Sequence, residues 1–260
     1  MKLIELVFDP TATDRHYYGG PNGWKTRLSL LHMGIDVETE EASVCDLRYK
    51  LSEIHGKRIT SPAIELEDGS LLCGSFDIAE YLEDKFPDRL SLFTGSLSKS
   101  VDAVKAKHFK VGKTYARLID AGLGASDPQW AIWFDLVFPD IDKRVAQGEI
   151  REYFISDARL GPGGYEKMCK RGAQEDLVAR AKLNVLPLIQ VLKQNQGQFL
   201  QGEEPGFVDY VVFGRYAMCR NNNPKLAKEV WEDQGEEIQG WVERIVQRYP
   251  SIQKNLRAYE

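Results

Sequence analysis

Residues 59–86 place a proline, a tight turn and a helix start close together, a combination that suits the binding of a small peptide. Ser61-Pro62 opens a predicted strand, Asp68-Gly69 forms a hairpin, and Gly74-Ser75 begins a helix. X-Pro bonds adopt the cis form at low cost, and a cis proline here would turn backbone N–H and C=O groups toward a cleft. The helix start directs unpaired N–H groups and partial positive charge at the same cleft, where a carboxylate would bind.

The cysteines and histidines do not add a second chemical motif. The four histidines have no spacing typical of metal ligands, so no metal is expected. The four cysteines are far apart and form no CxxC, which indicates reduced packing thiols in a cytoplasmic protein. They are Cys45, Cys73, Cys169 and Cys219.

The composition is that of a globular protein with room for two domains. The chain has 260 residues, of which 43% are hydrophobic and 28% charged. The net charge of −5 is spread along the sequence, which argues against a nucleic-acid partner. The N-terminus reads as a strand rather than a signal peptide, and no apolar stretch nears the ~20 residues that cross a membrane.

The predicted elements change character at about residue 98. The first part has the order βαβα-ββα: strands are expected at 3–8, 35–39, 62–67 and 70–73, with helices from Trp24 to Gly34, over 46–55 and up to Phe86. This order is thioredoxin-like, without the CxxC. We therefore predict an α/β plus all-α fold, with a thioredoxin-like domain over 1–88, a linker over 89–97 and a helical domain over 98–260.

The second part reads as helices only. Helical patterns cover 103–121, 165–195, 207–219, 225–233 and 236–248, with a Gly-rich loop over 157–164. Pro187 is expected to kink or interrupt the second of these helices.

Two of these segments resemble those of a known family. The pattern P-A-I…D-G…S-F-x-I-A-x-Y-L resembles the glutathione-binding half of cytosolic glutathione transferases, and FLQGEEPGFVDYVVFG (199–214) resembles a helix start in their second domain. There Asp209 would cap a core helix, and Gly206 in place of the usual Ser or Thr allows only half of a capping box. The segment Pro21-Asn22-Gly23-Trp24-Lys25-Thr26-Arg27 is similar to the S-P-x-x-W-(K/R)-T-R signature of the etherase-related group, which includes the bacterial β-etherases that cleave lignin aryl ethers and their fungal relatives.

The resemblance implies glutathione as co-substrate and assigns residues to it. Ser61 and Pro62 would pair with its cysteinyl unit through the backbone, and Ser75 would bind the γ-glutamyl carboxylate. Lys57 and Arg58 are candidates for the glycine carboxylate. Gly74 replaces an acidic residue that the family often turns toward the tripeptide.

Activation of the glutathione thiol is where the sequence departs from the etherase-like pattern. Free thiols have pKa values near 8.5, so a transferase stabilises the thiolate with a hydrogen-bond donor and a helix start. The family Ser that precedes the loop proline is Gly20 here. Asn22 is the predicted catalytic donor, a role compatible with capping the helix; Tyr17, Tyr18 and backbone N–H groups are the alternatives.

The second substrate is expected to be an aromatic compound bound by Tyr17, Tyr18 and Tyr115. Trp130 and Trp133 are further candidates, with core packing as the alternative for each. Lys25 and Arg27 are expected either to face solvent or to tie the first helix to the second domain.

These features predict a homodimeric glutathione transferase that conjugates aromatic electrophiles or cleaves aryl ethers. Gly20 and Gly74 favour an alternative, a ligandin-like protein that binds aromatic or phenolic compounds with little catalysis. A thiol-dependent reductase of the omega type would need a cysteine in residues 9–24, which contain none.

Overall fold

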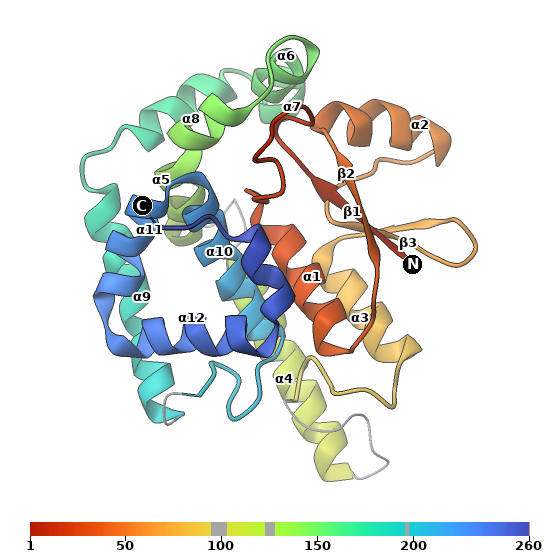
Figure 1. The fold of residues 1–260 in the computed structure, drawn as a ribbon, viewed down its shortest axis with the longest axis vertical. Coiled ribbons are helices and arrows are strands. Elements are labelled where there is room, and N and C mark those ends of the chain that lie inside the picture. Colours follow the sequence, from red (N-terminus) through yellow and green to blue (C-terminus); the bar gives the residue numbers. More distant parts are fainter. Residues whose placement is uncertain (95–102, 123–127, 196–197, 260) are drawn as a thin grey trace.

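The computed structural model describes residues 1–94, 103–122, 128–195 and 198–259, which form a small sheet domain and a larger helical region (Figure 1). The sheet has the order β2-β1-β3-β4. Its strands are β1 (Lys2–Leu6), β2 (Glu38–Ala42), β3 (Ala63–Glu65) and β4 (Leu71–Cys73). β1 and β2 are parallel, whereas β3 is antiparallel to both β1 and β4, which confirms the predicted parallel unit followed by a hairpin.

The period-two alternation of the strands gives the sheet two apolar faces. Leu3 and its partner Ile64 belong to the large core that includes α1 (Pro21–His32) and α3 (Ser75–Lys85). Ile4 and Ala63 belong instead to a small cluster with Leu47 on the π-helical segment η1 (Asp46–Leu51), which the short helix α2 (Ser52–Ile54) continues. One face of the sheet therefore packs toward the helical region, and the other has its own small core.

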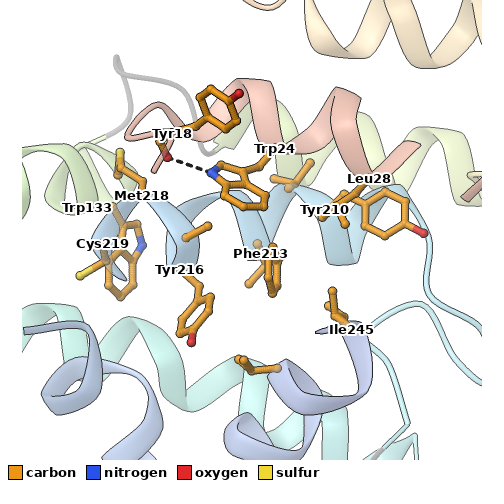
Figure 2. Packing of buried hydrophobic residues seen from close by; sticks show 14 of the residues in the cluster. Tyr18, Trp24, Leu28, Trp133, Tyr210, Phe213, Tyr216, Met218, Cys219 and Ile245 are labelled. Carbon is orange, nitrogen blue, oxygen red and sulfur yellow. Dashed lines mark hydrogen bonds between the residues drawn. The ribbon is translucent and has the colours of Figure 1, made fainter. Parts of the chain in front are cut away.

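Helix α10 (Phe207–Asn222) is the centre of the helical region and is buried along nearly its whole length. Tyr210, Phe213 and Tyr216 project from it into the core, as Figure 2 shows. The other elements are α4 (Ala103–Gly122), α5 (Pro128–Arg144), α6 (Glu149–Ile155), α7 (Asp157–Leu160), α8 (Gly164–Gly172), α9 (Leu177–Gln194), α10 (Phe207–Asn222), α11 (Pro224–Val230), η2 (Glu232–Gln234), α12 (Glu236–Arg248) and η3 (Pro250–Asn255). None of the helices in the described ranges is long and apolar enough to span a membrane.

The two parts of the chain are joined by a close contact between α1 and α10. A Cβ atom on Gly214 of α10 would lie 2.4 Å from the carbonyl oxygen of Pro21, so only glycine allows this approach. Trp24 of α1 packs its ring edge-on to Phe213 at a centroid distance of 5.8 Å. The start of α1 therefore rests directly on the backbone of the second domain's central helix.

Several element boundaries differ from those predicted. The strand expected at 35–39 is β2 at Glu38–Ala42, because Ile35 still donates to the carbonyl of Leu30 in the turn that ends α1. The helix expected over 165–195 is two helices, α8 and α9; a Cβ on Gly172, where α8 ends, would lie 3.1 Å from the Asp135 carbonyl of α5. Helix α9 continues through Pro187, and the loop expected at 157–164 contains the one-turn helix α7. The expected domain start at residue 98 lies outside the described residues.

Candidate functional site

A cleft of about 700 Å³ lies between the sheet domain and the helical region. It brings together four of the residues predicted from the sequence, namely Asn22, Ser61, Pro62 and Ser75. The sheet domain also contributes Pro21, Lys25, Thr60, Gly74, Phe76 and Asp77, and the helical region contributes Arg117, Asp120, Phe134, Asp135, Arg159, Leu160, Met168, Arg171 and Arg215. Short segments that are distant in the sequence thus meet at one cleft, which is lined by both polar and apolar side chains.

The loop before β3 forms one wall of the cleft. The Ser61–Pro62 peptide bond is cis, as predicted. The hydroxyl of Ser61 accepts a hydrogen bond from the backbone N–H of Leu6 at 3.1 Å, and the carbonyl of Pro62 accepts one from Gly74 at 3.1 Å. The Ser61 side chain therefore anchors this loop to the end of β1, a structural role that the sequence did not reveal.

The start of α3 lies beside this loop. Gly74 precedes the helix with φ = +93°, in the region that favours glycine, and a Cβ there would lie 3.1 Å from an Asp77 carboxylate oxygen. Ser75 is the first helical residue and is 7% exposed at the cleft. The backbone conformation thus explains why an acidic residue does not occupy position 74, and the N–H groups of the first turn remain available to an anion.

The start of α1 forms the next part of the cleft. Pro21 is the first helical residue, a position that suits proline because the N–H it lacks would have had no partner within the helix. Gly20 occupies the cap position without a side chain, so the expected role of Asn22 as the cap is wrong. Asn22 instead lies in the first turn, exposed at the cleft. A Cβ on Gly20 would meet no atom within 4 Å.

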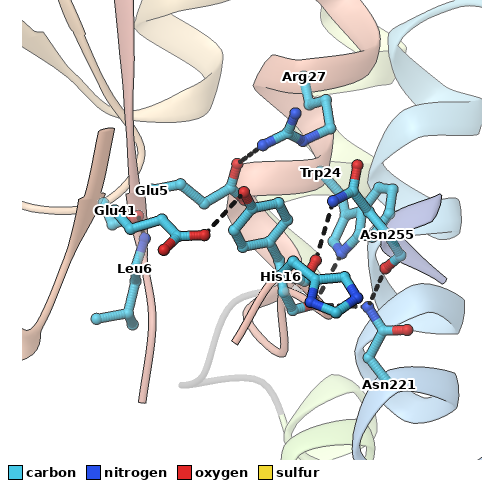
Figure 3. A network of polar contacts seen from close by, with 10 residues as sticks. Glu5, Leu6, His16, Trp24, Arg27, Glu41, Asn221 and Asn255 are labelled. Carbon is cyan, nitrogen blue, oxygen red and sulfur yellow. Dashed lines mark hydrogen bonds and ion pairs between the residues drawn. The ribbon is translucent and has the colours of Figure 1, made fainter. Parts of the chain in front are cut away.

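Side chains of the second domain, together with Trp24 of α1, hold the loop that leads to α1. Four of its carbonyls accept hydrogen bonds of 2.9–3.1 Å, in part shown in Figure 3: His16 from Asn255, Tyr17 from Arg144, Tyr18 from Asn221 and Trp24, and Gly19 from Asn222. None of these donors was predicted from the sequence. The signal that could have indicated them is the polar run Arg220-Asn221-Asn222-Asn223 at the end of an otherwise apolar helix.

Lys25, Asp120 and Arg215 meet where α1, α4 and α10 border the cleft. Lys25 is 3% exposed and donates to Asp120, so it does tie the first helix to the second domain. Burial lowers the pKa of Lys25 to about 8 and that of Arg215 to about 10, while the nearby Asp120 carboxylate opposes both shifts. Arg27 instead forms an ion pair of 2.5 Å with the buried Glu5 of β1.

The structure does not bring the three predicted substrate-binding tyrosines to this cleft. Tyr18 is buried beside a separate cavity of about 690 Å³, where Arg27 lies 4.6 Å from its ring centroid. Tyr17 packs under Arg257, and Tyr115 is 42% exposed on α4. The anchored loop carbonyls explain the first two positions, because they fix which way residues 16–19 face.

The remaining candidates lie in the core, on the surface or outside the description. Trp133 is fully buried and stacks on Trp231 at 4.4 Å, so core packing is its role. The side chain of Trp130 is outside the described residues. Lys57 and Arg58 are exposed and do not line the cleft; the Lys57 ammonium donates to the carbonyl of Leu71.

Comparison with known proteins agrees with this architecture. Residues 15–90 match the family model of the glutathione S-transferase N-terminal domain. Among solved structures, glutathione transferase GSTFuA3 of Phanerochaete chrysosporium has a TM-score of 0.67 at 19% identity, with 95% of this chain and 96% of that chain covered.

Two further similar structures are transferases from Ceriporiopsis subvermispora, both solved in complex with glutathione. CsGST63524 has a TM-score of 0.69 at 15% identity, with 99% of this chain and 98% of that chain covered. CsGST83044 has a TM-score of 0.65 at 18% identity, with 95% and 96% covered. Residues 15–90 thus match a glutathione S-transferase N-terminal domain, and the chain as a whole has the fold of these solved glutathione transferases.

Proposed function

We propose that this protein binds glutathione in the cleft and transfers its thiolate to an aromatic electrophile. The observation that carries the proposal is the meeting of three elements at one cleft: the cis-Pro62 loop, the start of α3 at Ser75 and the start of α1 at Asn22. The loop offers backbone groups to the cysteinyl unit, and the α3 start offers N–H groups to the γ-glutamyl carboxylate. The solved relatives with bound glutathione support the same co-substrate.

Ser75→Ala tests the placement of glutathione. Removing this hydroxyl should weaken glutathione binding by roughly 1–3 kcal/mol, as expected for a lost hydrogen bond to a charged group. Calorimetric titration measures this change, with Ser70→Ala in the exposed hairpin as the control, since the Ser70 hydroxyl donates to Asp68 away from the cleft. Equal affinity of the Ser75 variant and the wild type would contradict the placement.

The class of reaction is a finer proposal. We assign the protein to the etherase-related transferases, in which the thiolate displaces an aryl ether oxygen or a halide and forms a thioether. The supporting feature is the segment from Pro21 to Arg27, whose proline and asparagine line the cleft. Turnover of a panel of lignin-type aryl ethers and aryl halides, followed by release of phenol or halide, tests this assignment.

A ligandin-like role is the second candidate. It is favoured by Gly20, which leaves no hydroxyl at the cap of α1. Tight binding of phenolic ligands together with no turnover of any electrophile in the panel would replace the enzymatic proposal with this one.

The assembly and location are also proposals. Helix α4 exposes an apolar stripe of Val111, Tyr115 and Leu118, which are 61%, 42% and 66% exposed. We propose that this stripe is buried in a homodimer, the commonest kind of oligomer, and that the protein works in the cytoplasm, in keeping with its four free cysteines. Light scattering of the wild type and of Leu118→Glu tests the dimer: a monomeric wild-type mass would contradict it.

A further inference from the structure

The helical side of the cleft combines apolar side chains with guanidinium groups. Phe134 of α5, Leu160 of α7 and Met168 of α8 form the apolar part. Arg159 and Arg171 line the same side. A flat apolar body with one charged substituent fits such a surface better than a purely apolar molecule does.

The arginines of the cleft differ in whether their charge is balanced. Arg171 donates to both oxygens of Asp135 at 3.0 Å, and Asp135 is 5% exposed. Arg117 stacks over the Phe76 ring at 3.5 Å and lies 3.8 Å from an Asp77 carboxylate oxygen. Both guanidinium groups therefore have a carboxylate within reach.

Arg159 has no such partner in the part of the chain that the structure describes. It donates to the carbonyl of Phe154 at 2.7 Å, and its guanidinium carbon lies 4.1 Å from the centroid of the Phe154 ring. Its burial lowers the pKa of the guanidinium without a carboxylate to oppose the shift. The group is held in place by a ring and a carbonyl, yet its positive charge is not neutralised, which is unfavourable in a partly buried position.

We propose that the second substrate is an aromatic electrophile that carries an anionic group, a carboxylate or phenolate, and that Arg159 pairs with this group. This inference rests on the proposed transferase function and names its substrate class. The aromatic ring packs on Leu160, Met168 and Phe134, while the guanidinium binds the anion with two parallel N–H donors.

The reaction itself needs no further reactant. The glutathione thiolate forms a bond from sulfur to the electrophilic carbon, which is a ring carbon in an aryl halide and the alkyl carbon bonded to oxygen in an aryl ether, and the bond from that carbon to the halide or ether oxygen breaks. The leaving group takes the electron pair and departs as a halide or a phenolate, the phenolate then taking a proton from water. Arg159 acts in substrate selection and does not touch the reacting atoms.

The test compares one electrophile in an anionic and a neutral form. Chlorodinitrobenzoate and its methyl ester are each supplied with glutathione. For each electrophile, kcat/KM is divided by the rate constant of its uncatalysed reaction with glutathione, so that differences in intrinsic reactivity cancel. Arg159→Gln should lower this ratio for the acid by about tenfold or more, mainly through KM, and change it for the ester by less than about twofold. Arg159→Lys should recover part of the preference for the acid. Lys170→Gln, on α8 outside the cleft, removes the same charge from the exposed surface and should change neither ratio.

Several outcomes would overturn the inference. One is that Arg159→Gln lowers the ratio of kcat/KM to the uncatalysed rate constant equally for the acid and the ester, and another is that it lowers the ratio for neither. A third is that Arg159→Gln weakens glutathione binding, which would assign the guanidinium to a glutathione carboxylate. If no electrophile reacts, the transferase proposal fails, but titration of chlorodinitrobenzoate into the protein still tests whether Arg159 binds an anionic aromatic compound. Binding that Arg159→Gln weakens about tenfold supports the anion site, and absence of binding rejects it.

Discussion

At the scale of single residues, the proposed thiol transfer assigns stabilisation of the thiolate to Asn22, the exposed amide in the first turn of α1. Asn22→Ala should lower turnover by about tenfold or more while changing glutathione affinity much less, because a donor to the thiolate is lost and the α3 contacts remain. The thiol pKa of bound glutathione, read from thiolate absorbance against pH, should rise.

Asn22→Asp provides the matched contrast. A carboxylate in the first helical turn favours the helix, yet it repels a thiolate. A purely structural role predicts full activity for Asn22→Asp, whereas our proposal predicts a thiol pKa above that of the wild type.

Gly20→Ser should raise turnover, because it adds a hydroxyl at the cap of α1. The backbone at Gly20 is ordinary extended structure (φ −92°, ψ 140°), and a Cβ there meets nothing within 4 Å. Gly19→Ser is the control: its Cβ would lie 2.4 Å from the Phe8 ring and 2.9 Å from the Asn222 amide oxygen, so it should lose stability instead. Steady-state kinetics and thermal unfolding of the two variants measure both effects, and a less active Gly20→Ser would show that the loop does not use a hydroxyl.

The sequence could indicate those site residues that lie next to local turn and helix signals. Pro62, Ser75 and Asn22 adjoin a proline or a helix start, and they meet at the cleft. Arg159 and Arg171 could not be found in this way, because only the packing of α8 against α5, and of α7 against α8, brings them to the cleft. Tyr17 and Tyr18 lie away from the cleft for the same reason, since distant asparagines orient their loop.

At the scale of elements, Asp209 joins three segments of the second domain: the start of α10, the turn before it and α12. It accepts hydrogen bonds from the backbone of Gly206, which is the predicted half of the capping box, and also from Leu200, Gln201 and the Trp241 indole, at 2.8–3.2 Å. Asp209→Ala should destabilise the protein by on the order of 3–5 kcal/mol, because these buried donors lose their acceptor. Chemical denaturation measures this, and Asp88→Ala, at an exposed position in the turn after α3, should change stability by less than about 0.5 kcal/mol.

The packing around Asp209 also explains why the other half of the capping box is absent. A Cβ on Gly206 would lie 2.0 Å from the side chain of Gln201, which itself donates to the carbonyl of Leu92. The sequence showed that the hydroxyl was missing but not that Gln201 occupies its space, because that contact depends on the fold of the preceding turn.

At the scale of the whole molecule, His32 connects the two domains. The ring at the end of α1 is 2.6 Å from the Tyr210 hydroxyl of α10, and Tyr210 in turn contacts Tyr249. Burial, together with the charge of Arg248, lowers the pKa of His32 from 6.5 to about 4. The unfolded chain therefore binds a proton between these pH values that the folded protein does not bind.

Stability should accordingly be lost as the pH falls from about 6.5 toward 4. The contribution of His32 to this loss is about 2–3 kcal/mol at pH ~4.5, from the size of the pKa change. Denaturation at neutral and acidic pH measures it, and His32→Gln should remove that part of the pH dependence while His55→Gln, in the turn after α2, retains it. An unchanged pH profile in His32→Gln would show that other groups cause the acid sensitivity.

The contact of Gly214 with the Pro21 carbonyl bears on how such proteins can be recombined. A chimera that joins this sheet domain to the helical half of another protein of the same fold would keep each apolar core, yet the geometry of its cleft would depend on a glycine supplied by the other protein. A bulkier residue there would push the first turn of α1 out of the cleft without unfolding either half. One backbone contact therefore limits how freely the two halves can be exchanged between proteins. A functional hybrid needs a glycine at position 214 as well as a compatible linker.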